Sequence, residues 1–218
     1  MKSLSSIRRV VLAAAVAITG LTAVAVPAAV HAASASAPQR GRQADPIADQ
    51  AVRALFLLNQ SIASGDSTAR TSYEQERNSI ADGIASRLGI EAAPLRTAFA
   101  KADIEHQQAL IGAFTQLGVP YRKNTSIAGV GFDCSGITTY AWAQAGITLQ
   151  RSSSAQIRAA APLVPETAQA GDLVQYPGHV MMWLGVDRAI VHSRQPGHNV
   201  EVDVISNKKN LRFGDPTS

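Results

Sequence analysis

Apolar positions between Pro46 and about Leu117 recur three and four residues apart, which is the period of an amphipathic helix. The pattern is interrupted at Gly65-Asp66 and at Gly89, residues that commonly stand at helix ends. It therefore predicts three helices, packed as an antiparallel hairpin or a small bundle. The positions that share the apolar faces are Leu55, Leu58 and Ile62, then Tyr73, Arg77, Ile80, Ile84 and Leu88, then Leu95, Phe99, Ala102, His106, Leu110, Phe114 and Leu117.

The pattern changes after Gly118-Val119-Pro120, where glycine and proline become frequent and the apolar runs become short. One helix is predicted over residues 134–145, closed by Gly146. A helix followed by strands is typical of an α+β domain with an antiparallel sheet. The chain from Lys208 onward is polar and is expected to be frayed. The predicted strands are Asp172 to Tyr176, Val180 to Leu184, Ala189 to Val191 and Val200 to Ile205.

The first 32 residues have the pattern of a secretory signal peptide. They carry Lys2, Arg8 and Arg9 but no acidic residue, and an uncharged stretch runs from Val10 to Val26. Small residues then precede a predicted cleavage site after or near Ala32. An uncleaved membrane anchor is the alternative, since the apolar run approaches spanning length. Residues 33–44, rich in Ala, Ser, Pro, Gln, Arg and Gly, are expected to form a flexible linker.

Composition excludes some classes of protein. The chain has 218 residues, of which 46% are hydrophobic and 17% charged, so disorder throughout is excluded. The net charge is +4, from 20 basic and 16 acidic residues; without the three basic residues of 1–32 the balance is 17 to 16, or +1. A chain so near neutrality has no nucleic-acid footprint. A single cysteine also excludes an intramolecular disulfide framework and a Cys-rich zinc module.

That lone cysteine, Cys134, is placed where a nucleophile would be useful. A glycine-rich loop leads into Asp133, a good N-cap residue, and then into the predicted helix. Cys134 therefore falls in the first turn, where free N–H groups and the helix dipole favour a thiolate. A buried inert thiol and an intermolecular crosslink are the alternatives for an unpaired cysteine in an exported protein.

A thiolate catalyst needs a base and a group that orients the base. Two of the five histidines, His179 and His192, lie on a predicted hairpin. If its two-residue tip pairs Gly185 with Arg188, His179 lies opposite Arg194 and on the same face as His192. A three-residue tip without a bulge would send the two rings to opposite faces. Of the other three, His31 lies in the signal, His106 on an apolar helix face as a packing residue, and His198 in a surface turn.

The order of these features resembles the NlpC family of secreted bacterial cysteine peptidases, which cleave peptidoglycan stem peptides. The resemblance covers roughly residues 104–206, and its most specific part is Phe132-Asp133-Cys134-Ser135-Gly136. It implies an α+β, papain-like domain in which the nucleophile helix precedes an antiparallel sheet. The other segments that carry it are Leu117-Gly118-Val119-Pro120-Tyr121, Ala145 to Ser153, Gly171-Asp172-Leu173-Val174, Gly178-His179-Val180 through Gly185, and Val191-His192-Ser193.

The resemblance also implies roles for individual residues. Cys134 would be the nucleophile and His179 the general base. His192 would hold the His179 ring in a useful tautomer. Tyr121 would lie near the nucleophile and help to hold the oxyanion or the substrate. The residues that would line the groove for the stem peptide are Asp133, Ser135, Arg151, Ser152 and Ser153.

By the same resemblance the scissile bond would be the one from γ-D-glutamate to diaminopimelate or lysine, and no metal or cofactor is needed. The protein would be secreted or located in the cell wall, would meet a membrane only during export, and would have peptidoglycan stem peptides as its partners. One departure concerns substrate choice: Tyr121-Arg122-Lys123-Asn124-Thr125 stands where the family has a Trp-Gly-Gly-type run.

The expected organisation is a signal peptide (1–32), a linker (33–44), a helical region (45–103) and a cysteine peptidase domain (104–218). Three other functions stay open. The chain is a cell-wall amidase of a related cysteine–histidine fold, a wall-binding module without turnover, or a protein whose helical region binds a regulatory partner or covers the groove as an autoinhibitor.

Overall fold

The computed structural model describes residues 41–206 and 210–217, which belong to one compact unit that begins at Ala37. The predicted signal peptide lies outside the described residues, as does most of the predicted linker. The last four linker residues are described and contact the rest of the chain. The Gln43 N–H donates to the Gly118 carbonyl at 2.9 Å, and the Asn199 amide donates to Gln43 Oε1 at 3.2 Å.

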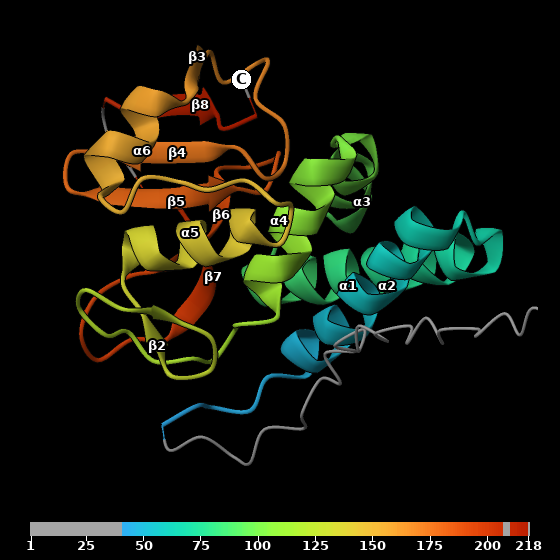
Figure 1. The fold of residues 1–218 in the computed structure, drawn as a ribbon. Helices are drawn as coiled ribbons and strands as arrows, with labels where there is room; N and C mark the ends of the chain where they lie inside the picture. Colours follow the sequence, from blue (N-terminus) through green and yellow to red (C-terminus); the bar gives the residue numbers. More distant parts are fainter. Residues whose placement is uncertain (1–40, 207–209, 218) are drawn as a thin grey trace, which may run out of the picture. The chain divides into compact units, whose positions relative to one another are not determined.

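Four helices occupy the first part of the described chain (Figure 1). They are α1 (Pro46–Ser64), α2 (Ser67–Leu88), α3 (Ala92–Lys101) and α4 (Ile104–Phe114). Asp45 and Asp66 cap the first two helices by accepting hydrogen bonds from backbone N–H groups two and three residues ahead. Gly65 and Gly89 end them in the left-handed conformation, as the sequence pattern predicts.

The third predicted helix is two helices, because the chain breaks at Ala102-Asp103. Ala102 takes an extended conformation, and its carbonyl accepts a hydrogen bond from the Gln107 side chain at 2.6 Å. The Asp103 N–H donates to the Gln169 side chain at 2.8 Å. The apolar spacing continues across this break without a glycine or proline, which is why the pattern reads as one helix. The expected bundle is thus confirmed, with four helices in place of three.

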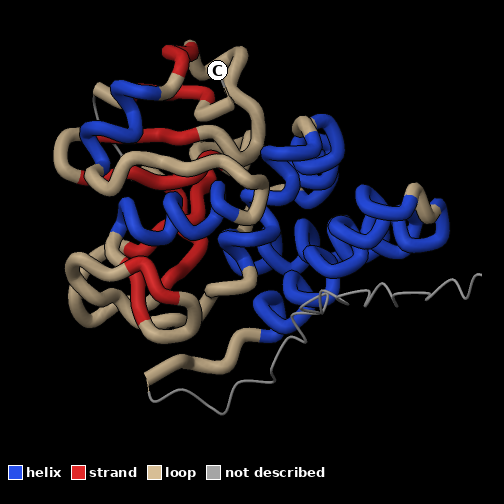
Figure 2. Tube along the Cα trace, in the orientation of Figure 1, coloured by secondary structure: helices blue, strands red, loops and turns tan. Residues whose placement is uncertain are grey.

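The second part begins with a small two-stranded sheet, β1 (Ser126–Ile127) and β2 (Gly131–Phe132). Two helices follow, α5 (Cys134–Ala143) and α6 (Ser153–Ala159). Helix α5 begins where the sequence predicts and is followed by Gly146 at φ 77°. It packs against α4 on one side and against strands β5 and β6 on the other (Figures 1 and 2).

The main sheet has six strands in the order β3-β8-β4-β5-β6-β7, and every neighbouring pair is antiparallel. The α+β class with an antiparallel sheet is therefore confirmed. Strands β4 to β7 match the four predicted runs to within two residues. The bounds are β3 (Ala161–Leu163), β4 (Leu173–Tyr176), β5 (His179–Trp183), β6 (Ala189–Ser193), β7 (Val200–Val204) and β8 (Arg212–Asp215).

The prediction of a frayed end is wrong for the described residues 210–217. Strand β8 lies inside the sheet, between β3 and β4. Its one large apolar side chain is Phe213, which is buried, and Gly214 packs closely against Ala160. Backbone pairing with two neighbours holds this short strand, and a polar sequence conceals such pairing.

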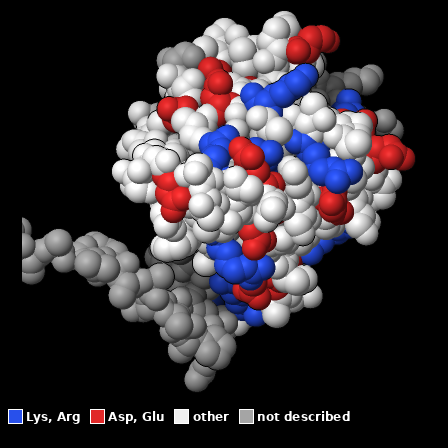
Figure 3. All heavy atoms as spheres, turned by 90° about the vertical axis from the view of Figure 1, so that its right-hand side faces the viewer, with Lys and Arg blue, Asp and Glu red and all other residues white. Residues whose placement is uncertain are grey.

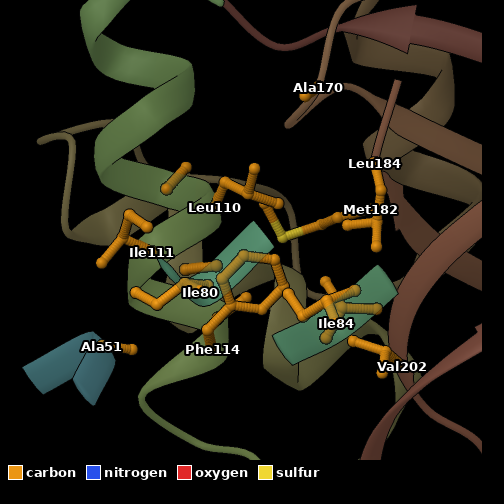
Figure 4. Packing of buried hydrophobic residues seen from close by; sticks show 14 of the residues in the cluster. Ala51, Ile80, Ile84, Leu110, Ile111, Phe114, Ala170, Met182, Leu184 and Val202 are labelled. Atoms are coloured by element: carbon orange, nitrogen blue, oxygen red, sulfur yellow. The ribbon is translucent and has the colours of Figure 1, made fainter. Parts of the chain in front are cut away.

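One apolar core joins the helices to the sheet. Figure 4 shows Ile80 and Ile84 of α2 and Leu110 and Phe114 of α4 in the same cluster as Met182 and Val202 of the sheet. A buried polar contact adds to this junction, because His106 Nε2 of α4 lies 2.9 Å from Asp172 Oδ1 beside β4. Burial raises the pKa of Asp172, and the His106 contact opposes that rise.

Charge is spread over the surface. Lys and Arg side chains alternate with Asp and Glu on the face seen in Figure 3. Ion pairs on the helices, such as Arg70 with Glu74 and Arg96 with Asp82, account for part of this mixture. Within residues 41–206 and 210–217, the structure contains no helix of the length and hydropathy that a membrane span requires.

Candidate active site

Cys134 is the first residue of α5 and is half-buried. Asp133 caps the helix, with Oδ1 accepting a hydrogen bond from the Gly136 N–H at 2.7 Å. Gly136 is required by packing, because a Cβ there would collide with the Thr125 carbonyl oxygen. The loop before the helix is thereby fixed against its first turn, and the thiol lies at the end of the helix where backbone N–H groups have no helical partners.

Asp133 and Arg151 form a closed pair beside the thiol. The guanidinium donates to both carboxylate oxygens of Asp133, at 2.9 and 2.8 Å, and to Ser135 Oγ at 2.8 Å. Asp133 Oδ2 also accepts a hydrogen bond from the Asn124 N–H at 2.8 Å. These contacts, with Asp133 first, raise the pKa of Arg151, and the charge of Cys134 acts in the same direction.

Two tyrosines lie within electrostatic range of the thiol. Burial raises the pKa of Tyr121, and the charges of Asp133 and Cys134 add to the rise. Burial likewise raises the pKa of Tyr176, to which the charge of Cys134 contributes. Tyr121 and Tyr176 come from separate segments, so Cys134 faces both the loop before β1 and the end of β4.

His179 and His192 form a hydrogen-bonded pair that is almost fully buried. His179 Nε2 lies 2.9 Å from His192 Nδ1, and the rings are 6% and 5% exposed. Trp183 pairs with Ile190 and Met182 with Val191, which is the register that the two-residue tip predicts. This register places both rings on the same face of the hairpin, and the three-residue alternative is excluded.

Tyr176 connects the thiol to this pair, and the sequence reasoning assigned it no role. Its ring centroid lies 5.3 Å from that of His179, and it also lies within range of the Cys134 charge. Tyr176 pairs with His179 across a turn of Pro177 and Gly178. The signal was present in the sequence, since a Pro-Gly turn between two strands sets the flanking residues opposite each other.

Two acidic residues lie on the far side of His192 and were also missed. Glu201 Oε1 is 3.7 Å and Asp203 Oδ2 is 3.9 Å from His192 Nε2. Both belong to β7, where Glu201 pairs directly with His192. The strand was predicted, but the pairing of β7 with β6 could not be derived because the connecting residues 194–199 give no tight turn signal.

The other predicted groove residues surround the start of α6. Ser152 caps this helix, with its Oγ accepting a hydrogen bond from the Ala155 N–H at 3.3 Å, and Ser153 is the first residue of the helix. Ser135 is buried, whereas Arg151 and Ser152 are exposed. Gln156 of α6 was not singled out from the sequence, yet its buried amide ties α5, α6 and residue 150 together.

Another group of titratable side chains, outside this site, consists of His106, Asp172 and Asp215, whose ligand-type atoms all lie within 4.8 Å of one another. Asp172 accepts hydrogen bonds from the His106 ring and from the Gln169 N–H, and Asp215 accepts from Thr217. These bonds give the group a structural role at the junction of α4 with the sheet.

Comparison with known proteins places the site in a recognised family. Residues 118–212 match the model of the NlpC/P60 family. The probable endopeptidase Rv2190c of Mycobacterium tuberculosis is 38% identical over 93 residues, which are 41% of this chain and 24% of that protein. The peptidoglycan endopeptidase RipB of Mycobacterium tuberculosis is 37% identical over 101 residues, which are 39% of this chain and 42% of RipB.

Among solved structures, RipD of Mycobacterium tuberculosis, described as a non-catalytic NlpC/p60 domain protein, is 24% identical with a TM-score of 0.43. The similarity covers 52% of this chain and 98% of that one. The match spans only 24% to 42% of the length of the two curated relatives. What is shared is one domain, and residues 118–212 of this chain are accordingly an NlpC/P60 domain.

Proposed function

We propose that this chain is a peptidoglycan hydrolase, a cysteine endopeptidase that cleaves amide bonds of stem peptides. The observation that carries the proposal is the buried pair of His179 and His192, joined at 2.9 Å and linked through Tyr176 to a half-buried thiol at a helix N-terminus. The relatives named endopeptidases, matched over this same domain, support the reaction class.

The histidine pair determines which ring nitrogen receives the thiol proton. With Nε2 of His179 engaged by His192 Nδ1, His179 takes the proton of Cys134 at Nδ1. The sulfur then attacks the amide carbonyl carbon and forms a tetrahedral adduct. His179 returns its proton to the leaving amine as the C–N bond breaks, and a thioester remains on Cys134. Water hydrolyses the thioester after giving its proton to His179, and the thiolate leaves.

The start of α5 stabilises the charge that develops on the carbonyl oxygen. The backbone N–H groups of the first turn, including that of Cys134, have no carbonyl partner within the helix and point toward that oxygen. Tyr121, whose phenol keeps its proton because its pKa is raised, adds a hydroxyl donor on the side of the loop. No step of this scheme calls for a metal or cofactor.

The substrate class follows from the family and from the charged groups beside the thiol. We propose cleavage between γ-D-glutamate and diaminopimelate or lysine. Arg151 keeps part of its guanidinium exposed while Asp133 and Ser135 hold it in place, so it offers a fixed positive charge to the carboxylate of the stem peptide. Ser152 and Ser153 line the same rim of the groove.

The domain limits and the location are part of the proposal. Residues 1–32 direct export and are removed, residues 33–44 link, residues 45–103 form a helical region, and residues 104–218 are the peptidase domain. The protein then acts outside the cell, in or near the wall. The name of RipB, a peptidoglycan endopeptidase, supports this location.

Digestion of defined muropeptides, with products identified by mass spectrometry, tests the proposal. Residues 33–218 should release one fragment that ends in D-glutamate and one that begins with diaminopimelate or lysine. The Cys134→Ala variant, purified in parallel, should leave the substrate intact. Release of the whole stem peptide would assign the amidase activity instead, and substrate untouched by both proteins would leave a wall-binding module.

A further inference from the structure

The far nitrogen of the second histidine raises a question that the catalytic scheme leaves open. His192 uses Nδ1 to contact His179, while its Nε2 is buried and has no hydrogen-bond partner within the described residues. A buried polar atom without a partner costs free energy, so its surroundings should show why it is tolerated. The inference below rests on the proposed function, because His179 must act as a base.

Only one tautomer of His192 permits that base. If His192 carries its proton on Nδ1, it donates to His179 Nε2, and the neutral His179 ring then holds its own proton on Nδ1. In that state His179 cannot take a proton from a thiol. If His192 carries its proton on Nε2, its Nδ1 accepts a proton from His179 Nε2, and His179 Nδ1 is a base.

Strand β7 places negative charge where the second tautomer needs it. Glu201 stands directly opposite His192 in the ladder, and its Oε1 lies 3.7 Å from His192 Nε2. The separation is longer than a hydrogen bond, so the carboxylate acts through its charge, attracting a proton on Nε2. The ring beside it is only 5% exposed, which limits screening by water on the histidine side.

The surroundings of Glu201 keep it ionised. The contact with His192 lowers the pKa of Glu201 and outweighs the effect of burial, and His198 acts in the same direction. His198 Nδ1 lies 3.2 Å from Glu201 Oε1, which fixes the carboxylate between the two rings. Asp203 also faces His192, at 3.9 Å, but Arg194 lies equally close to that carboxylate and offsets its charge.

We propose that Glu201 is a positioning residue that holds His192 in the Nε2-protonated tautomer and so keeps His179 Nδ1 able to accept the proton of Cys134. Glu201 touches neither substrate nor thiol. It completes a line of side chains from Cys134 through His179 and His192, and it strengthens Nδ1 of His192 as an acceptor when His179 becomes positively charged.

Nitrogen NMR of the histidine rings reads the tautomer directly, because protonated and unprotonated ring nitrogens have well-separated chemical shifts. The measurement uses residues 33–218 with Cys134→Ala, so it does not depend on turnover, and His192 is assigned from the signals lost in His192→Gln. The test variant is Glu201→Gln, which removes the charge and keeps the shape. The matched control is Asp203→Asn, the same change two residues away on the same face of the strand.

We expect the Nε2-protonated form of His192 in the parent and in Asp203→Asn, and a mixture of tautomers in Glu201→Gln. With Cys134 restored, Glu201→Gln should lower kcat about tenfold, as outer partners of functional imidazoles do, and leave KM unchanged. An unchanged tautomer in Glu201→Gln, or an equal change in Asp203→Asn, would overturn the inference. An inactive parent would refute the proposed function alone, since the NMR result would still decide the role of Glu201.

Discussion

Arg151 holds Asp133 through both carboxylate oxygens, across 18 residues of sequence, and so fixes the loop that ends at Cys134. Asp133 has no oxygen to spare for other work, because it also caps α5 and accepts from the Asn124 N–H. The pair is therefore the support on which the thiol rests, and Arg151 alone faces the solvent.

Replacement of Arg151 by lysine tests this support. Lysine keeps the charge but cannot make the two-pronged contact with Asp133 or reach Ser135 at the same time. We expect a loss of about 1 kcal/mol in the free energy of unfolding, reduced from that of a buried pair because the side chain is 44% exposed. Urea denaturation measures the loss, and Arg158→Lys on α6 is the control. An Arg151→Lys variant as stable as Arg158→Lys would contradict the role.

The two histidines of the site should differ in their effect on turnover. His179→Ala removes the base and should lower kcat by about 10²–10⁴. His192→Gln keeps an acceptor for His179 Nε2 and should lower kcat only about tenfold. Steady-state kinetics on a stem peptide, with His198→Gln as the control that keeps wild-type activity, check the order. An effect of His192→Gln as large as that of His179→Ala would argue against an orienting role.

The contact between His106 and Asp172 should matter for stability and not for catalysis. Asp172→Ala leaves the buried His106 ring and the Gln169 N–H without their partner. The expected cost is about 3 kcal/mol of unfolding free energy. Asp82→Ala, at an exposed ion pair, should cost less than about 1 kcal/mol. Thermal and urea unfolding measure both variants, and equal losses would show that the buried contact contributes nothing special.

Asp45 should make stability sensitive to acid. Burial alone would raise its pKa, but the ion pair with Arg87 and the backbone N–H groups of α1 outweigh burial and lower it below the ordinary 3.8. The folded state therefore binds fewer protons, so this contribution is present above pH 3.8 and is lost as the pH falls below it.

Asp45→Asn, which keeps a capping side chain, should cost about 0.5–1 kcal/mol at pH 7. The difference from wild type should close as the pH falls below 3.8. Arg87→Gln should reproduce the same loss, and the double variant should show no further loss, since both remove one interaction. A difference that persists at pH 3 would place the effect in the cap and not in the ion pair.

The sequence predicted those parts of the fold that depend on local chemistry. The caps at Asp45 and Asp66, the glycines that end the helices and the start of α5 at Cys134 follow from residue types at short range. The register of the β5–β6 hairpin was predictable because a tight tip fixes pairing along both strands. That register decides whether His179 and His192 face each other.

What the sequence could not predict depends on long-range pairing. Strand β8 is polar and joins the sheet between strands far away in sequence. Glu201 meets His192 only because β7 pairs with β6 in one register. The contact of Ile84 with the same cluster as Met182 and Val202 is equally non-local, and it means that residues 104–218 without the helices would expose part of the core.

The central claim is that the thiol of Cys134 is the nucleophile, and turnover of a purified stem peptide by Cys134→Ala measures this most directly. Alanine removes one sulfur from a half-buried position, so the fold should persist, as circular dichroism would show. The account predicts wild-type hydrolysis and a loss of more than about 10³-fold in kcat for the folded variant. Hydrolysis by Cys134→Ala at a rate near that of the wild type would contradict it.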